Sequence, residues 1–133
     1  MTENLKRAIE TLCEELGLPK PPADDPVIDV NGHELRIVQL SGHKAVLMGT
    51  LGSLSSIADE RRESTDTLLM RSLTLHGARF AKLGTPEALT LEDNTMVLWN
   101  KFDSETISVQ DFLQSSESML NEMEFWKNWL AAA

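Results

Sequence analysis

The chain has 133 residues, of which 41% are hydrophobic and 25% are charged, a composition typical of one globular domain with a substantial core. Its formal net charge of −9 argues against nucleic-acid binding, which depends on clustered lysine and arginine. No apolar run approaches the roughly 20 residues of a membrane-spanning helix, and the amphipathic start MTENLKRAIETL lacks the pattern of a secretory signal. We therefore expect a single domain over residues 1–133 that stays in the cytoplasm and binds neither nucleic acid nor membrane.

The first predicted helix covers residues 3–17 and ends at Gly17. Its apolar residues recur at spacings of four, three and four, so they share one face: Leu5, Ile9, Leu12 and Leu16. The one cysteine, Cys13, lies beside them, which favours a buried structural thiol over a nucleophile and a reducing compartment over a disulfide framework. Residues 17–26 then hold four of the five prolines and predict a stiff connector.

From residue 27 onward the apolar period changes to two. VIDV and HELRIVQL flank Asn31-Gly32, a strong hairpin signal, because both turn positions require positive φ. The turn SGH leads to a third strand over residues 44–52, which completes an antiparallel meander. This strand is apolar on both faces and needs cover on both sides. Either helices supply all of the cover, or a partner supplies part of it.

Residues 53–62 are expected to form a polar loop, and a second helix is expected from about Ser64 to Ala81. One stripe of this helix is largely apolar: Leu69, Leu73, His76 and Phe80. Another face is mostly small and lets a neighbouring helix approach closely: Met70, Thr74, Gly77 and Ala81. That face is either a contact between two protomers or an inert side of the helix.

A second hairpin is predicted from residues 87–91 and 95–102, and the last helix from Ser108, a suitable N-cap, to about Leu130. The element order is therefore α-βββ-α-ββ-α, an α+β fold in which helices cover a twisted antiparallel sheet. Between Lys101 and Lys127 the chain has six acidic residues and no basic one. This acidic stretch is either a solvated face or a surface that attracts a basic protein partner.

The stretch EMEFWKNWL, residues 122–130, holds three of the seven aromatic residues of the chain. At about 100° per residue, one sector of the last helix faces the sheet and includes Phe112, Met119, Met123, Trp126 and Leu130. Phe125 and Trp129 lie roughly 100° to 140° from it, one helical turn apart. They form a second apolar patch, covered either by the first helix or the chain's own end, or by a partner.

The sequence offers no catalytic or metal-binding signature. His33, His43 and His76 are scattered without ligand spacing, and His76 is expected to be a hydrogen-bonded core or interface residue. The stretch GTLGSLSS lacks the Gly-Lys-Ser/Thr ending of a phosphate-binding loop, and the paired acids fall in turns, where solvation leaves their pKa little reason to shift. We therefore predict neither an enzyme nor a cofactor.

Size, acidity and element order resemble those of the class I type III secretion chaperones, small acidic homodimers that bind one exported effector in the bacterial cytoplasm. The similarity covers nearly the whole chain. It rests on the following stretches: LKRAIETLCEELGLP, VIDVNGHELRIVQL with the apolar third strand, TLLMRSL, LTLEDNTMVLWNKFD and FWKNWL.

The resemblance implies that two protomers pair through the second helix and the neighbouring fourth strand, with contacts at Met70, Thr74, Gly77, Leu89 and Leu91. It also implies that the effector's N-terminal segment wraps around the dimer as an extended chain and stays secretion-competent without ATP. The candidate effector contacts are Leu5, Ile9, Leu12, Ile28, Val30, Leu35, Ile37, Phe125 and Trp129, the first three where they exceed what the core needs. The alternatives are a small homodimeric regulator that sequesters a folded protein and, third, a small enzyme.

Overall fold

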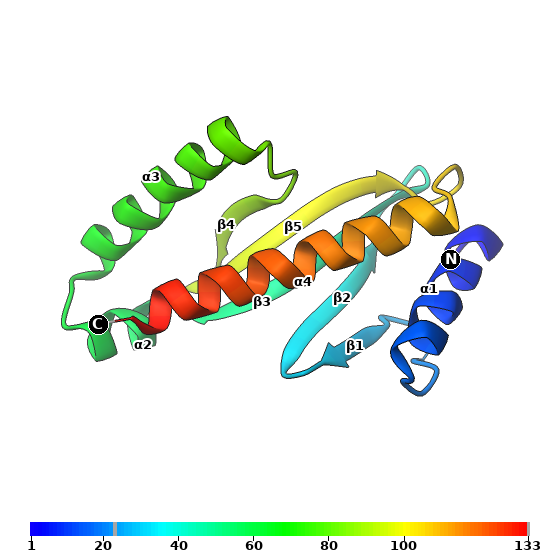
Figure 1. Ribbon diagram of the computed structural model, residues 1–133, viewed down its shortest axis with the longest axis horizontal. Helices are drawn as coiled ribbons and strands as arrows, with labels where there is room; N and C mark the ends of the chain where they lie inside the picture. Colours follow the sequence, from blue (N-terminus) through cyan, green and yellow to red (C-terminus); the bar gives the residue numbers. More distant parts are fainter. Residues whose placement is uncertain (23, 133) are drawn as a thin grey trace.

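The computed structural model describes residues 1–22 and 24–132 (Figure 1). In chain order the elements are α1 (Glu3–Leu16), β1 (Val27–Val30), β2 (His33–Gln39), β3 (Lys44–Ser53), α2 (Leu54–Arg61), α3 (Thr65–Leu83), β4 (Ala88–Glu92), β5 (Thr95–Asp103) and α4 (Val109–Ala131). The predicted α+β fold and order are confirmed, with one additional short helix, α2. Among the described residues, no helix is both long and apolar enough to cross a membrane.

The five strands form one antiparallel sheet in the order β1-β2-β3-β5-β4. Strand β3 therefore lies at the centre, and β1 and β4 form the two edges. The predicted turn between β1 and β2 is confirmed, because Asn31 and Gly32 have φ values of 53° and 83°. The meander β1-β2-β3 and the hairpin β4-β5 meet where β3 pairs with β5.

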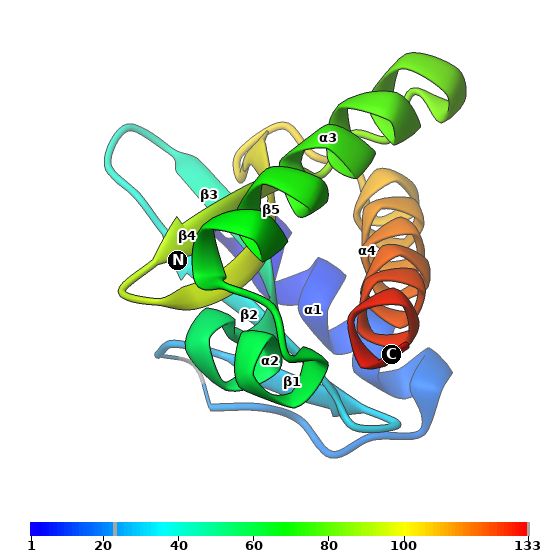
Figure 2. The ribbon, with the colours of Figure 1, turned by 90° about the vertical axis from the view of Figure 1, so that its left-hand side faces the viewer.

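Helix α4 crosses one face of the sheet, and α1 packs beside it (Figures 1 and 2). The α4 residues that the sequence places against the sheet are buried: Phe112, Met119, Met123, Trp126 and Leu130. Helix and strand approach closely, since a Cβ atom added to Gly49 would lie 2.5 Å from the Met123 Sδ atom. At its start, α4 is capped by Ser108, whose Oγ accepts a bond from the Asp111 amide at 3.0 Å.

The opposite face of the sheet is less well covered. Met48 and Trp99 are register partners on β3 and β5 and are half-buried, whereas Leu47 and Leu98, which point towards α4, are completely buried. The apolar character of both faces of β3 is thus matched by helix packing on one face and only in part on the other.

Helix α2 corrects the prediction of a polar loop over residues 53–62. Ser53 caps the helix by accepting a bond from the Ser56 amide, and the side chain of Asn94 donates to the Ser53 and Ser55 hydroxyls. The helix has eight residues and buries mainly Leu54 and Ala58, one turn apart. A pattern of two apolar residues is too short to be distinguished from a loop by periodicity.

Helix α3 begins after Ser64, as predicted, but it buries a different face. Leu68 and Ser72 are completely buried, whereas Leu73 is 44% and Phe80 61% exposed. Two members of the predicted stripe therefore face solvent, and Leu69 and His76 are half-buried. The reason is that α3 contacts the domain along a narrow strip near α2 and β4, while its C-terminal half projects from the body (Figure 1).

Candidate protein-binding surfaces

The first candidate surface lies where α1 meets the proline-rich connector. A hollow of about 150 Å³ opens there, lined by Met1, Lys6, Ile9, Glu10, Lys20, Pro21, Pro22 and Pro26. The Lys20 Nζ atom lies 2.8 Å from a Glu10 carboxylate oxygen and ties the connector to α1. The hydrogen bond and the charge of Lys20 lower the pKa of Glu10. Because proline fixes φ, the connector is stiff and keeps the hollow open.

Strand β1 borders this hollow and is an edge of the sheet. It pairs with β2 from Val27 to Val30, and within the described residues no strand pairs with its other side. A second hollow, next to the first, is lined by residues 18–22 and 27–29. An unpaired edge presents backbone N–H and C=O groups that can hydrogen-bond to an extended chain. Hollow and edge together offer an extended peptide both apolar and backbone contacts.

The structure places most of the predicted effector contacts at this end in the core. Six of them are at most 5% exposed: Leu5, Ile9, Leu12, Ile28, Leu35 and Ile37. They fill the space between α1, the sheet and α4, because their periodic spacing puts them on the inner faces of these elements. Val30 is half-buried. The large apolar side chains exposed at this end are Met1, Leu16, Val27 and Leu40.

Phe125 and Trp129 lie together on the side of α4 that faces α2 and α3, and both are half-buried. The Arg79 guanidinium lies 3.5 Å from the centroid of the Phe125 ring. Those of Arg61 and Arg71 lie 5.2 and 5.7 Å from the Trp129 ring. Arginines of α2 and α3 therefore cover the aromatic pair. A guanidinium group over an aromatic ring is attracted to it by a cation–π interaction, which helps to hold both side chains in place.

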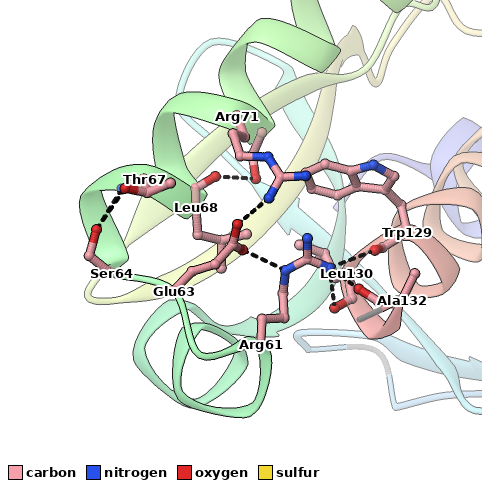
Figure 3. Close-up of polar contacts among 10 residues, drawn as sticks. Arg61, Glu63, Ser64, Thr67, Leu68, Arg71, Trp129, Leu130 and Ala132 are labelled. Carbon is pink, nitrogen blue, oxygen red and sulfur yellow. Dashed lines mark hydrogen bonds and ion pairs between the residues drawn. The ribbon is translucent and has the colours of Figure 1, made fainter.

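Arg61 joins α2, α3 and the end of α4 (Figure 3). Its Nη1 atom donates to the carbonyl oxygens of Trp129, Leu130 and Ala132 at the end of α4, and the Trp129 oxygen also accepts a bond from the Ala132 amide. Its Nε atom bonds a Glu63 carboxylate oxygen at 2.7 Å, and Arg71 bonds the other oxygen. The hydrogen bond from Arg61 is the main cause that lowers the pKa of Glu63. One carboxylate is thus shared by two guanidinium groups.

A buried polar cluster lies between α3, the start of β4 and α4. Arg79 makes two hydrogen bonds to Glu122, which is 7% exposed. Glu87 is 2% exposed; its Oε1 atom accepts a bond from the Ser118 hydroxyl, and its Oε2 atom has no partner among the described residues. Burial raises the pKa of Glu87, and the charge of Glu122 adds to this. His76 contacts the Glu87 carbonyl at 2.9 Å, which confirms it as a hydrogen-bonded histidine.

The second candidate surface consists of α3 and β4. Five large apolar side chains are exposed there: Met70 at 65%, Leu73 at 44%, Phe80 at 61%, Leu83 at 63% and Leu91 at 42%. Of the residues predicted to join two protomers, Thr74 and Gly77 are also exposed, and Leu89 is buried beneath the strand at 8%. Several large apolar side chains left exposed on two neighbouring elements favour an interaction site.

Histidine, cysteine and acidic side chains do not form a metal-binding group within residues 1–22 and 24–132. His43 lies in the turn before β3, exposed and 3.5 Å from Glu105. Cys13 is buried, as predicted, and burial raises the pKa of its thiol. A raised pKa disfavours the thiolate that nucleophilic chemistry requires.

No protein-family model matches the chain, and no curated protein sequence matches it significantly. Solved structures do. A chain in the crystal structure of the ExsC–ExsE complex superimposes with a TM-score of 0.73 at 13% identity, over 100% of this chain and 99% of that one. The HopA1–SchA chaperone–effector complex gives a TM-score of 0.64 at 16% identity, over 92% of each chain.

A third match is the Yersinia pestis type III secretion chaperone SycH in complex with a stable fragment of YscM2. Its TM-score is 0.58 at 15% identity, over 92% of this chain and 98% of that one. At such identities the likeness defines the fold. The chain has the fold of the class I type III secretion chaperones, as the sequence resemblance indicates.

Proposed function

We propose that the protein is a type III secretion chaperone. It binds the N-terminal segment of a cognate exported effector as an extended, non-globular chain, in the bacterial cytoplasm and without ATP. Binding keeps the segment stable and competent for secretion. The fold supports this proposal, because chains of the same fold were crystallised with protein partners, among them an effector and a YscM2 fragment.

The observation that carries the proposal is the open edge of β1 beside the hollow under α1. An extended segment can pair its backbone with β1 and direct alternate side chains towards Val27 and the hollow. Its other side chains would point to solvent. Such a mode favours an unfolded segment, because all of its backbone groups and alternate side chains are available for pairing.

We also propose that the chaperone works as a homodimer, joined through α3 and β4. The exposed apolar side chains on these elements support the contact, since a monomer in water gains nothing from exposing them. Met70, Thr74, Gly77 and Leu91 would take part directly, and Leu89 would support the strand from beneath. The two α1 surfaces would remain free in such a dimer, because α1 and α3 lie at opposite ends of the molecule (Figure 1).

The experiment starts from partners that co-purify with the tagged protein from bacterial cytosol. The N-terminal segment of each partner is then made as an isolated peptide, and its affinity is measured after ATP removal by apyrase. We expect the peptide to bind about as tightly as the whole partner. Val27→Glu, which places a charge beside the β1 edge, should weaken binding by about tenfold or more. Gln110→Glu adds the same charge on the exposed side of α4 and should have no effect.

Failure of every isolated N-terminal peptide to bind, together with binding of a folded partner body, would contradict the chaperone proposal. It would favour instead the regulator that sequesters a folded protein. Loss of peptide binding with Gln110→Glu as well as Val27→Glu would remove the β1 edge as the binding site.

A further inference from the structure

Helices α3 and α4 diverge from the point where they meet near the end of α4 (Figures 1 and 2). Side chains of both helices line a groove there. It has a volume of about 440 Å³ and is lined by Met70, Arg71, Thr74, Leu75, Ala78 and Trp129. Arg71 is the one charged residue in this lining, and its side chain is 51% exposed. The groove is therefore an apolar channel with a cation at its rim.

The segment that supplies most of the groove lining, residues 54–84, is opposite in net charge to the rest of the molecule. Residues 54–84 carry five cations against four acids, a net charge of +1 in a chain of −9: Arg61, Arg62, Arg71, Arg79 and Lys82 against Asp59, Glu60, Glu63 and Asp66. At the groove itself, the guanidinium groups of Arg61 and Arg71 share the single carboxylate of Glu63. One positive charge is left over, so a carboxylate arriving at the rim would be attracted.

The chain carries a segment of matching chemistry on the same apolar surface. Of the five exposed apolar side chains on α3 and β4, Leu91 is the one followed directly by two acids, Glu92 and Asp93, and both are exposed. The turn is well defined, because the Asn94 side chain donates to the Ser53 and Ser55 hydroxyls. A preorganised loop loses little conformational entropy when it docks.

We propose that, in the homodimer, the Leu91–Asp93 turn of each protomer docks into the α3–α4 groove of the other. Leu91 lies against Met70 and Trp129, and a carboxylate of the turn meets Arg71. This inference rests on the proposed homodimer and specifies how the two copies recognise each other. In a two-fold dimer the same contact occurs twice, because groove and turn belong to one chain.

A second copy fits the groove better than the extended cargo does. The cargo surface at the other end of the molecule has acids around it, among them Glu10, Glu14, Asp24, Asp25 and Asp29. A segment that suits those acids is basic and would be repelled by Arg71. Outside residues 54–84 the second copy carries 7 cations against 17 acids, a net charge of −10, so its overall charge complements the groove.

The test uses two charge-reversed variants and native mass spectrometry together with light scattering. Arg71→Glu reverses the charge at the groove. The double change Glu92→Arg and Asp93→Asn reverses the charge at the turn, and asparagine tolerates the φ of 46° at position 93. Each variant alone should dimerise about 100-fold more weakly than the wild type, because each homodimer contains two repulsive contacts.

Mixing the two variants should restore the dimer as a heterodimer. In it, one contact joins Glu at position 71 to Arg at position 92, and the other is the wild-type contact. Homodimers of near wild-type affinity from both variants, or no heterodimer on mixing two folded variants, would overturn the proposal. Arg36→Glu, an exposed arginine on β2 outside the groove lining, and Glu105→Arg, an acid in another turn, are the matched controls and should leave the dimer unchanged.

A third variant covers the case in which Arg71→Glu does not fold, since Arg71 also contacts Glu63 and Trp129. Thr74→Trp fills the groove without changing charge, and Thr74 is exposed. It should weaken the dimer at least tenfold while the melting temperature stays within a few degrees of the wild type. An unchanged dimer would overturn the docking. A wild-type chain that is monomeric while it still binds its cargo peptide would overturn the homodimer and leave the chaperone proposal standing.

Discussion

Glu87 is a carboxylate buried in an incompletely satisfied environment. One oxygen accepts a bond from Ser118, the other has no partner among the described residues, and the charge of Glu122 lies close by. Burial without full hydrogen bonding raises the pKa of Glu87 above its ordinary value of 4.5. The folded protein therefore binds this proton more tightly than the unfolded chain does. The contribution of Glu87 to stability becomes less favourable as pH rises from 4.5 through the raised pKa.

Glu87→Gln should stabilise the protein at pH 7 by about 1 kcal/mol, because the amide keeps the Ser118 contact without a buried charge. The gain should be smaller at pH 4.5, because the raised pKa means that the wild-type carboxyl is mostly protonated at that pH. Urea denaturation of both proteins at the two pH values measures the difference. Glu117→Gln, on the exposed side of α4, is the control and should show little change at either pH. A loss of stability at pH 7 would mean that the Glu87 anion is favourably held.

Gly49 has no side chain because α4 occupies the space. An added Cβ would lie 2.5 Å from Met123 Sδ and 2.9 Å from Met123 Cγ, and Met123 is itself completely buried. Gly49→Ala should therefore cost about 1–3 kcal/mol of unfolding free energy. Gly77→Ala is the matched control, since nothing lies within 4 Å of its Cβ position in the middle of α3. At position 77, alanine should raise the unfolding free energy by about 0.5–1 kcal/mol. Equal effects in denaturant titrations would contradict the close approach of α4 to β3.

At the scale of elements, Arg61 acts as an external cap for α4. The carbonyl groups at the end of a helix have few partners within it, and one guanidinium group donates to three carbonyls at the end of α4. The same side chain is 8% exposed and stacks on Trp129. Helix α2, which the sequence did not predict, thus positions the residue that fixes the end of the longest helix.

Arg61→Ala should lower the unfolding free energy by about 2 kcal/mol, since it removes three hydrogen bonds to the end of α4, two of them part-buried, and the ion pair with Glu63. The loss should be local, so hydrogen exchange ought to rise in residues 126–131 and far less at the start of α4. Arg62→Asn removes the neighbouring exposed arginine at a position with a φ of 57°, which asparagine tolerates, and should alter neither quantity. Uniform exchange along α4 in the Arg61 variant would show that the cap is not what holds its end.

Strand and helix positions could be predicted where a periodic pattern was long enough. The sector of α4 around Trp126 and the Asn31-Gly32 turn illustrate this, because one helix face and one pair of φ angles decide each case. The orientation of α3 could not be predicted, since the apolar stripe with Leu73 and Phe80 is the one left exposed. An apolar stripe indicates that one face of a helix is buried from water. It does not indicate whether the same chain or a partner buries that face.

The contacts of the aromatic pair were beyond sequence reasoning for a similar reason. Phe125 and Trp129 were correctly separated from the core sector, but their covering groups are arginines of α2 and α3. Arg71 and Arg79 lie about two turns apart on α3, whereas the two rings lie one turn apart on α4. Sequence spacing alone therefore does not pair each arginine with its ring. The pairing depends on how the two helices pack. Likewise, the periodic apolar spacing of the six core residues proposed for effector contact fits a binding interface and a core equally well. The sequence alone does not distinguish the two.

At the scale of the whole molecule, the apolar surface is divided between two ends. Met1, Leu16, Val27 and Leu40 are exposed at the end with α1 and the edge of β1, and the other exposed large side chains belong to α3 and β4 (Figure 1). The two ends also differ in charge, because residues 54–84 have a net charge of +1, whereas residues 1–30 have three cations against seven acids. This separation allows one end to hold cargo while the other holds a second protomer.

Phe80→Glu tests this division, since Phe80 is 61% exposed on the projecting half of α3. If the side chain is buried between two protomers, the change removes apolar burial and adds a charge in both copies. The dimer should then weaken by about 3 kcal/mol, or roughly 100-fold in Kd. The stability of the monomer should stay within about 0.5 kcal/mol, because the position is exposed. Sedimentation velocity across a concentration series measures the first quantity, and urea denaturation of the dilute protein measures the second.

Leu40→Glu is the matched control, because Leu40 is 43% exposed and lies at the cargo end. It should leave the dimer intact. A dimer that tolerates Phe80→Glu and dissociates with Leu40→Glu would place the protomer contact at the end assigned to cargo. The α3 and β4 surface would then be the one available to an effector, and the roles of the two ends would be exchanged.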